Sequence, residues 1–191
     1  MHDQLLRDAT AFHVTQKITL MVNRYRVTVA NPDGSDGPLV AFAQQKRMAF
    51  KEQVTVYTGE DQSQPLFGFR ARQALDLGAS YDVYDGDGSP IGLFRKNFGA
   101  SLLRSTWHLE QPGLPEVTGR ERSVFNALLR RFTDLDFLPY HFDFTHGEQP
   151  VMSLEKRWAL RDRYLLRVEN PALDRRLAIA MAVALDALQA R

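Results

Sequence analysis

The sequence predicts a mainly β protein in which antiparallel strands close into a barrel around a buried hydrophobic helix near the C-terminal end of the chain. Three observations support this fold class: apolar residues that alternate with polar ones, glycine-rich turns between the alternating runs, and one late segment that is apolar on every side. Closure removes the unpaired edges that so many strands would otherwise expose. The 191 residues suit one core, so we expect a single domain over residues 1–191.

The extended segments are recognised by their period of two residues. Apolar residues alternate from Lys17 to Ala30, but the phase changes on the way, which predicts a turn or bulge near Asn23 and Arg24. Asn31-Pro-Asp-Gly34 and Asp85-Gly-Asp-Gly88 carry the residues that tight turns favour, so each predicts a hairpin. The other strands are expected within residues 39–45, 54–57, 81–96, 101–109, 140–144, 151–160 and 164–168.

The segment from Leu177 to Leu188 predicts the buried helix, with Asn170 as its cap and Pro171 in its first turn. A helix that is apolar on all sides must be buried on all sides. Its length of about 18 Å falls short of the ~30 Å needed to span a bilayer and matches the height of a barrel. Asp186, its only polar residue, must be paired or lie at the barrel mouth, and we predict the mouth.

One additional amphipathic helix is predicted to begin at Thr118. Glu121 follows three residues later, so the two side chains form a capping-box pattern. The apolar stripe of this helix consists of Val124, Phe125, Leu128, Leu129 and Phe132. We interpret the arginines that lie off the stripe as a solvated face of a helix packed against the sheet.

Composition and charge exclude several classes of function. Twenty-four basic and 23 acidic residues give a net charge of +1, which provides no whole-molecule attraction to nucleic acid, so no nucleic-acid partner is predicted and any basic patch must be local. Cysteine is absent, which excludes disulfides and thiol chemistry and favours a reducing compartment. Residues 1–10 are too polar for a signal peptide, and no segment is predicted to be transmembrane, so a cytoplasmic location is expected.

No catalytic residue, metal or cofactor is predicted. His141, Asp143 and His146 come closest to a metal site, but they alternate with aromatic residues and are expected to face solvent. Asp85-Gly-Asp-Gly88 lacks the later ligands of a calcium loop, and the sequence contains neither a phosphate-binding P-loop nor a serine nucleophile elbow.

Four segments, taken in order, resemble the tubby C-terminal-like superfamily and in particular its phospholipid scramblase-like and LURP-one-related branches. They read NRYRVTVANPDG, AFAQQKRMAFKEQVTVY, YDVYDGDGSPIGLFRK and LDRRLAIAMAVALDAL, and the similarity extends from about Phe12 to Gln189. The resemblance implies a closed barrel of about twelve antiparallel strands around a central hydrophobic helix. Function diverges across this fold, and the resemblance does not imply an enzyme.

Tubby-like proteins are associated with phosphoinositide headgroups, so the resemblance directs attention to cations on the outside of the barrel. The candidates for binding an anionic headgroup are Lys46, Arg47, Arg95 and Lys96, at equivalent ends of two hairpins. Paired lysine and arginine side chains hold phosphate groups through charge-assisted hydrogen bonds. The alternative interpretation is an ordinary solvated strand face.

Two hypotheses of function follow. The first is a non-catalytic binding or scaffold domain that contacts anionic phospholipid or a protein partner, as a cytoplasmic protein peripheral to the membrane. The second is a small-molecule-binding β-barrel or an enzyme of unidentified reaction. The state of the barrel interior distinguishes them, because a barrel that binds small molecules inside needs a lumen.

Overall fold

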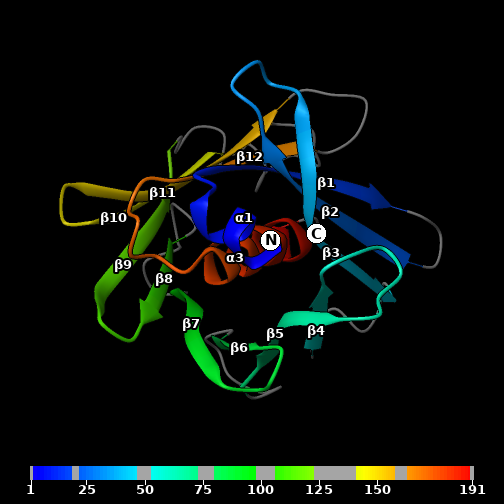
Figure 1. Ribbon diagram of the computed structural model, residues 1–191. Helices are drawn as coiled ribbons and strands as arrows, with labels where there is room; N and C mark the ends of the chain where they lie inside the picture. The colour runs from blue at the N-terminus through cyan, green and yellow to red at the C-terminus, as the bar shows by residue number, and fades with distance from the viewer. Residues whose placement is uncertain are drawn as a thin grey trace, which may run out of the picture.

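The computed structural model of the protein describes residues 2–18, 22–46, 53–72, 80–97, 106–122, 141–157 and 163–189. Twelve antiparallel strands form a closed barrel in which each strand pairs with the next and β12 pairs with β1 (Figure 1). The predictions of a mainly β protein and of a closed antiparallel barrel are therefore confirmed. The strands are β1 (Ala11–Ile18), β2 (Val22–Ala30), β3 (Asp36–Lys46), β4 (Gln53–Tyr57), β5 (Pro65–Ala71), β6 (Ser80–Asp85), β7 (Pro90–Asn97), β8 (Thr106–Gln111), β9 (Leu114–Glu121), β10 (His141–His146), β11 (Gln149–Arg157) and β12 (Arg163–Val168).

The first strand pair explains the change of phase in the sequence. Phe12 and Val14 of β1 are fully buried, while Lys17 has the opposite parity and is exposed. Asn23 and Arg24 pair with the last two residues of β1, so they lie inside β2. The turn or bulge predicted near Asn23 and Arg24 does not fall on these two residues, because the phase change marks two separate strands, of which β1 ends at Ile18 and β2 begins at Val22.

The two predicted hairpin turns are confirmed. Gly34 and Gly88 have φ angles of 84° and 87°, in the left-handed region that glycine adopts without a Cβ clash. In the second turn, the Asp85 carboxylate accepts the backbone N–H groups of Asp87 and Ser89 at 3.0 and 2.8 Å. These local bonds connect β6 to β7.

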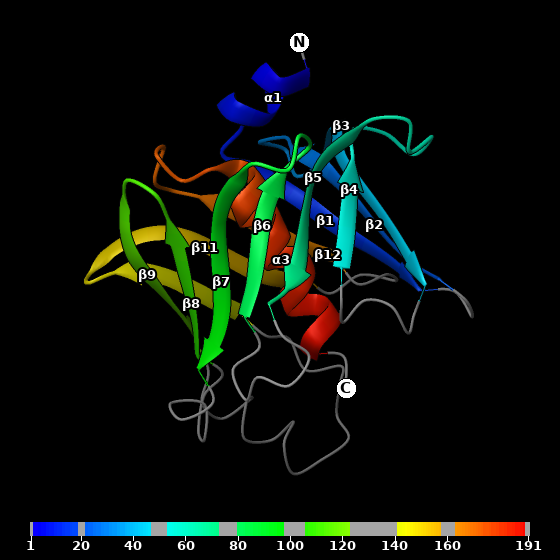
Figure 2. The same ribbon diagram turned by 90° about the horizontal axis from the view of Figure 1, so that it is seen from below.

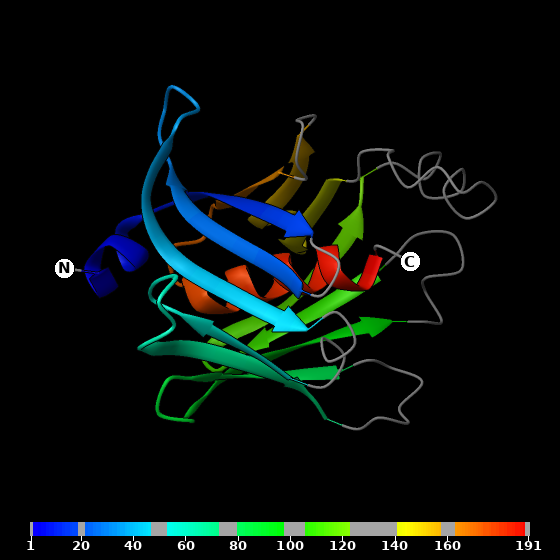
Figure 3. The same cartoon turned by 90° about the vertical axis from the view of Figure 1, so that its right-hand side faces the viewer.

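Helix α3 (Arg175–Gln189) carries the longest apolar run of the chain, and residues 177–186 are all buried. Figure 1 shows the ring of strands around α3, and Figure 3 shows the helix running along the inside of the barrel. Its nearest strands are β5, β6, β7 and β12. Within the described residues, no helix combines the length and the apolar character that a membrane crossing requires.

The start of α3 differs from the prediction. Asp174 occupies the capping position, since its Oδ1 accepts the backbone N–H of Arg176 at 2.8 Å. Asn170 was predicted to cap the helix, but its Oδ1 accepts the N–H of Ala172 at 2.9 Å in the turn that precedes it. The prediction for Asn170 is wrong because this residue forms a local side-chain turn four residues upstream.

Strand β9 occupies the residues where the additional amphipathic helix was predicted to begin. Thr118 pairs with strands on both sides, opposite His108 of β8 and Thr145 of β10, and Glu121 pairs with Phe142. The capping-box prediction is wrong, because the backbone groups of this segment are used by the sheet. The rest of the predicted helix, over 123–132, lies outside the described residues.

Helix α1 (His2–Asp8) lies at the end of the barrel where α3 begins, and α3 ends toward the opposite end (Figure 2). The imidazole Nε2 of His2 lies 2.9 Å from the carbonyl oxygen of Val40 in β3, and Leu6 is buried. Arg175, the first residue of α3, donates to the carbonyl of Ala9 at 3.2 Å. Both helices are thus tied to one another and to the sheet at this end.

Buried aromatic rings fill a large part of the space between the strands and α3. Phe69, Tyr81, Phe94 and Trp107 follow one another from β5 to β8, with ring centroids 5.1–6.3 Å apart. The Trp107 side chain is fully enclosed. Gly119 of β9 faces Phe144 of β10, and a Cβ added to Gly119 would lie 2.2 Å from the Phe144 ring.

We expect Gly119→Ala to destabilise the protein by about 1–3 kcal/mol, because the buried Phe144 ring or the strand must shift to admit the methyl group. The urea midpoint of unfolding measures the effect. Glu148→Ala, in an exposed turn, serves as the control and should leave the midpoint unchanged. A Gly119→Ala protein with the parent midpoint would contradict this packing.

Candidate functional site

The cations predicted from the sequence lie toward the end of the barrel opposite α1. Lys46 ends β3, where its backbone pairs with Val22, and Arg95 and Lys96 lie near the end of β7. Arg47 lies outside the described residues. Three strands separate β3 from β7, so at about 4.8 Å per strand the two positions are roughly 19 Å apart along the sheet. The backbone does not place them in one cluster.

Arg95 is held between two carboxylates on the outer surface. Its Nε donates to Glu110 at 3.2 Å and its Nη2 donates to Glu116 at 2.8 Å. Burial lowers the pKa of Arg95, but the two carboxylates outweigh it and the pKa is raised. An anion that approaches Arg95 therefore meets a guanidinium that is already neutralised. The Lys96 ammonium has a different environment, 5.9 Å from the centroid of the Trp107 ring.

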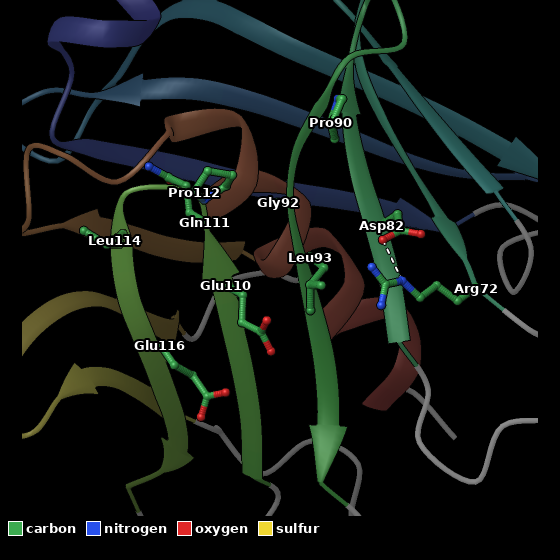
Figure 4. Close-up of a pocket in the computed structure, with 10 residues that line it drawn as sticks. All are labelled: Arg72, Asp82, Pro90, Gly92, Leu93, Glu110, Gln111, Pro112, Leu114 and Glu116. Atoms are coloured by element: carbon green, nitrogen blue, oxygen red, sulfur yellow. Dashed lines mark hydrogen bonds and ion pairs between the residues drawn. The ribbon is translucent and has the colours of Figure 1, made fainter.

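A shallow groove of about 440 Å³ lies outside the barrel, between parts of β6, β7, β8 and β9 (Figure 4). Its polar groups are engaged: Asp82 pairs with Arg72 at 2.8 Å, and Glu110 binds Arg95. Gln111 holds the segment before α3 by donating to the carbonyl of Ala172 at 2.9 Å and accepting the N–H of Asp174 at 2.8 Å. The groove walls are thus tied together by their own ion pairs and by the start of α3.

The single acidic residue of the apolar helix is buried and paired. Asp186 is 2% exposed, and its two carboxylate oxygens accept hydrogen bonds from the hydroxyls of Tyr25 and Tyr164. Gln16 donates to Tyr25 at 2.9 Å and extends this network. The prediction that Asp186 lies at the barrel mouth is wrong, because strands β2 and β12 supply two hydroxyl donors inside the barrel.

Two of the three residues that most resembled a metal site, Asp143 and His146, have protein partners. Arg122 donates two bonds to Asp143, at 2.6 and 2.8 Å, and these bonds lower the pKa of Asp143. The Nδ1 of His146 lies 3.1 Å from the carbonyl of Glu116. Phe142 and Phe144 of β10 are buried, as the alternation predicted. Asp143 therefore belongs to an ion pair on the outer surface.

A cationic surface that the sequence analysis did not predict lies on the outside of β11, β12, β1 and β2. Arg157 of β11 pairs with Arg163 of β12, and Lys17 of β1 pairs with Arg24 of β2. Thr15 lies between Arg163 and Arg26 in the same row. We use the name basic face for Lys17, Arg24, Arg26, Arg157 and Arg163.

The basic face contains two pairs of like charges in directly opposite positions. Such pairs destabilise a sheet, whereas opposite charges in the same positions stabilise it. Each pair belongs to a hairpin, one formed by the first two strands and the other by the last two. The two cations of each pair lie on strands that follow one another in sequence, but only the pairing of β1 with β12 brings the two hairpins together.

His13 lies on the same side of the sheet, buried to 3% exposure between a carboxylate and an arginine. Its Nδ1 is 2.9 Å from Asp36 and 2.6 Å from Nη2 of Arg163. Burial lowers the pKa of His13, the charge of Arg163 adds to this, and Asp36 opposes it, with a net lowering. Asp36 also accepts bonds from Thr28 and Arg163, which together with His13 outweigh burial and lower its pKa.

The structure is thus that of a mainly β domain, a closed antiparallel barrel of twelve strands with ion pairs on its outer surface. Residues 39–186 match the LURP-one-related family, so the chain belongs to this family and to the tubby-like and scramblase-like superfamily. Family membership points to a lipid-related binding domain. No significant match is found among curated proteins.

The environment of His13 predicts a loss of stability on mild acidification. Because its pKa is lower in the folded chain than the ordinary 6.5, His13 stabilises the fold above that pH, and this contribution is lost as the pH falls through the folded value. The corresponding loss for Asp36 comes only below its ordinary pKa of 3.8. We expect His13→Gln to lose less stability than the parent between about pH 7.5 and about pH 5.5.

Urea midpoints at the two pH values test this expectation. His146→Gln, at an exposed hairpin, is the matched control and should behave as the parent does. If His13→Gln lost as much stability as the parent, another group would be responsible for the acid sensitivity.

Proposed function

We propose that the protein is a non-catalytic binding domain whose outer surface contacts anionic phospholipid headgroups, and that α3 acts as the central plug of its barrel. The observation that carries this proposal is the burial of residues 177–186, which supports a filled interior and leaves the outside of the barrel for recognition. Family membership supports the lipid-related class of ligand. The filled interior argues against the alternative of a barrel with a ligand-binding lumen.

The hairpin-end cations Lys46, Arg47, Arg95 and Lys96 are one proposed contact for the headgroups. Arg95 would have to leave Glu110 and Glu116 to bind a phosphate, so we expect it to contribute little. We also propose a cytoplasmic location at the membrane surface, which the absence of cysteine supports.

The plug is tested by Ala182→Asp. Ala182 is 1% exposed, so a new carboxylate at this position would be buried without a prepared partner. We expect the free energy of unfolding to fall by at least about 4 kcal/mol, or folding to fail. Ala172→Asp introduces the same side chain at an exposed position before α3 and should have little effect. Equal urea midpoints for the two variants would contradict the plug.

Headgroup binding is tested by sedimenting the protein with vesicles of phosphatidylcholine alone or with added phosphatidylserine. We expect binding only to the vesicles that contain the anionic lipid, weakening as the salt concentration rises, because salt screens surface charges. Binding that is equal for both kinds of vesicle, or absent from both, would contradict the proposed function.

A further inference from the structure

We propose that the basic face is the surface by which the protein contacts an anionic phospholipid bilayer, with Lys17, Arg24 and Arg157 as the contacting cations. This inference rests on the proposed function and assigns its site. The site lies on β11, β12, β1 and β2, away from the hairpin end of β7.

The first support is the state of these three side chains. Lys17, Arg24 and Arg157 are exposed, and among the residues that the structure describes none of them forms an ion pair with a carboxylate. Arg24 donates from Nε to the neutral side chain of Gln44 at 2.7 Å, which orients the guanidinium and leaves its charge uncompensated. These cations are available to phosphate and carboxylate groups outside the protein.

Several cations elsewhere on the barrel do form ion pairs with carboxylates. Arg72 pairs with Asp82 at 2.8 Å, and Arg95 binds two glutamates. Arg122 binds Asp143 at 2.6 Å and also reaches a carboxylate on β11. On these other strands Arg72, Arg95 and Arg122 are neutralised by neighbours on the sheet. Arg70 of β5 and Arg120 of β9 are exposed with no carboxylate partner among the described residues, but each stands alone on its strand, whereas the basic face gathers three such cations on two neighbouring hairpins.

The second support is the energetic cost of the arrangement. Arg157 opposite Arg163, and Lys17 opposite Arg24, are repulsive pairs that reduce the stability of the sheet. Both arginines of the first pair also act on the buried His13 and lower its pKa, which supports their position on one side of the sheet. An anionic surface would relieve this repulsion, so binding converts a cost of the free protein into attraction.

The third support concerns Arg26 and Arg163, the two cations of the basic face that flank the three contacting cations. Arg163 donates to Asp36 at 2.8 Å, and Arg26 lies 3.1 Å from Glu60, so each keeps a carboxylate partner. Among the described residues, the five cations of the basic face therefore have two carboxylate partners, Asp36 and Glu60. The backbone of Lys46 borders the same region, because Lys46 pairs with Val22 two residues before Arg24.

A bilayer fits this surface better than nucleic acid does. The whole chain has a net charge of only +1, which gives little long-range attraction to a polyanion in solution. The cations lie on the outer face of a barrel, and the groove described above lies on other strands. A lipid surface supplies many anionic groups and attracts local clusters of lysine and arginine without a shaped cleft.

The test neutralises one repulsive pair with Lys17→Gln and Arg24→Gln together. Each cation near an anionic membrane contributes about a factor of five in binding, so the double variant should bind phosphatidylserine-containing vesicles roughly 25-fold more weakly than the parent. Its urea midpoint should be equal to or higher than that of the parent, because the repulsion is removed. Weaker binding together with undiminished stability supports the basic face as the contact.

Two further double variants provide the controls. Arg72→Gln with Arg120→Gln removes the same charge from exposed positions on other strands and should leave binding within about twofold. The second, Arg95→Ala with Lys96→Ala, compares the hairpin end of β7 with the basic face, and a larger loss of binding here than in Lys17→Gln/Arg24→Gln would overturn the basic face in favour of the hairpin-end contact.

The outcomes separate the site from the function. Parent protein that binds the anionic vesicles, with no loss in Lys17→Gln/Arg24→Gln, would overturn the basic face while the proposed function stands. A parent that does not distinguish anionic from neutral vesicles would overturn both. If Lys17→Gln/Arg24→Gln bound a labelled oligonucleotide more weakly than the parent does, while its binding to vesicles equalled that of the parent, the bilayer would be overturned as the occupant of this face.

Discussion

The burial of residues 177–186 of α3 is the constraint on which the rest of the structure depends. A helix with leucine, isoleucine, methionine, valine and alanine on every side cannot be satisfied by one sheet face, so strands must surround it. Closure between β1 and β12 meets this requirement and leaves no open sheet edge. Buried aromatic rings from β5 to β8 fill the space that the alanines of the helix leave, and Gly119 makes room for one more ring.

The same burial determines how the helix is fixed. Hydrophobic contact is non-directional and does not select one rotation of α3 inside the barrel. The Asp186 carboxylate does, because it must reach hydrogen-bond donors and finds the hydroxyls of Tyr25 and Tyr164 on β2 and β12. Those strands flank β1 at the closure of the sheet. One buried carboxylate therefore joins the helix to the strands beside the closure of the barrel, where the first strand pairs with the last.

In the proposed function, recognition takes place on the outside of the barrel, where the balance of charge varies from strand to strand. Around β7 to β10 the outward arginines Arg95 and Arg122 are paired with carboxylates, which stabilises the sheet there, while Arg120 of β9 has no carboxylate partner among the described residues. At the closure of the barrel, the hairpins formed by β1 with β2 and by β11 with β12 each present opposed cations to solvent. The strands at the closure of the barrel thus bind Asp186 of α3 on their inner side and carry the basic face on their outer side.

The sequence by itself determined the alternation of the strands, the glycine turns at Gly34 and Gly88, and the need to enclose residues 177–186, because period, turn chemistry and length are local properties. Local signals misled where sheet pairing overrode them, as at Thr118 and Glu121 in β9, and where a local turn took the side chain of Asn170. Tertiary structure alone decided which charges meet. It gave Arg95 two glutamates and Asp186 two tyrosines, and it placed Lys17 and Arg157, 140 positions apart in sequence, on neighbouring hairpins. The physical reason is that electrostatic partners depend on strand register and barrel closure, which are long-range consequences of burying one helix.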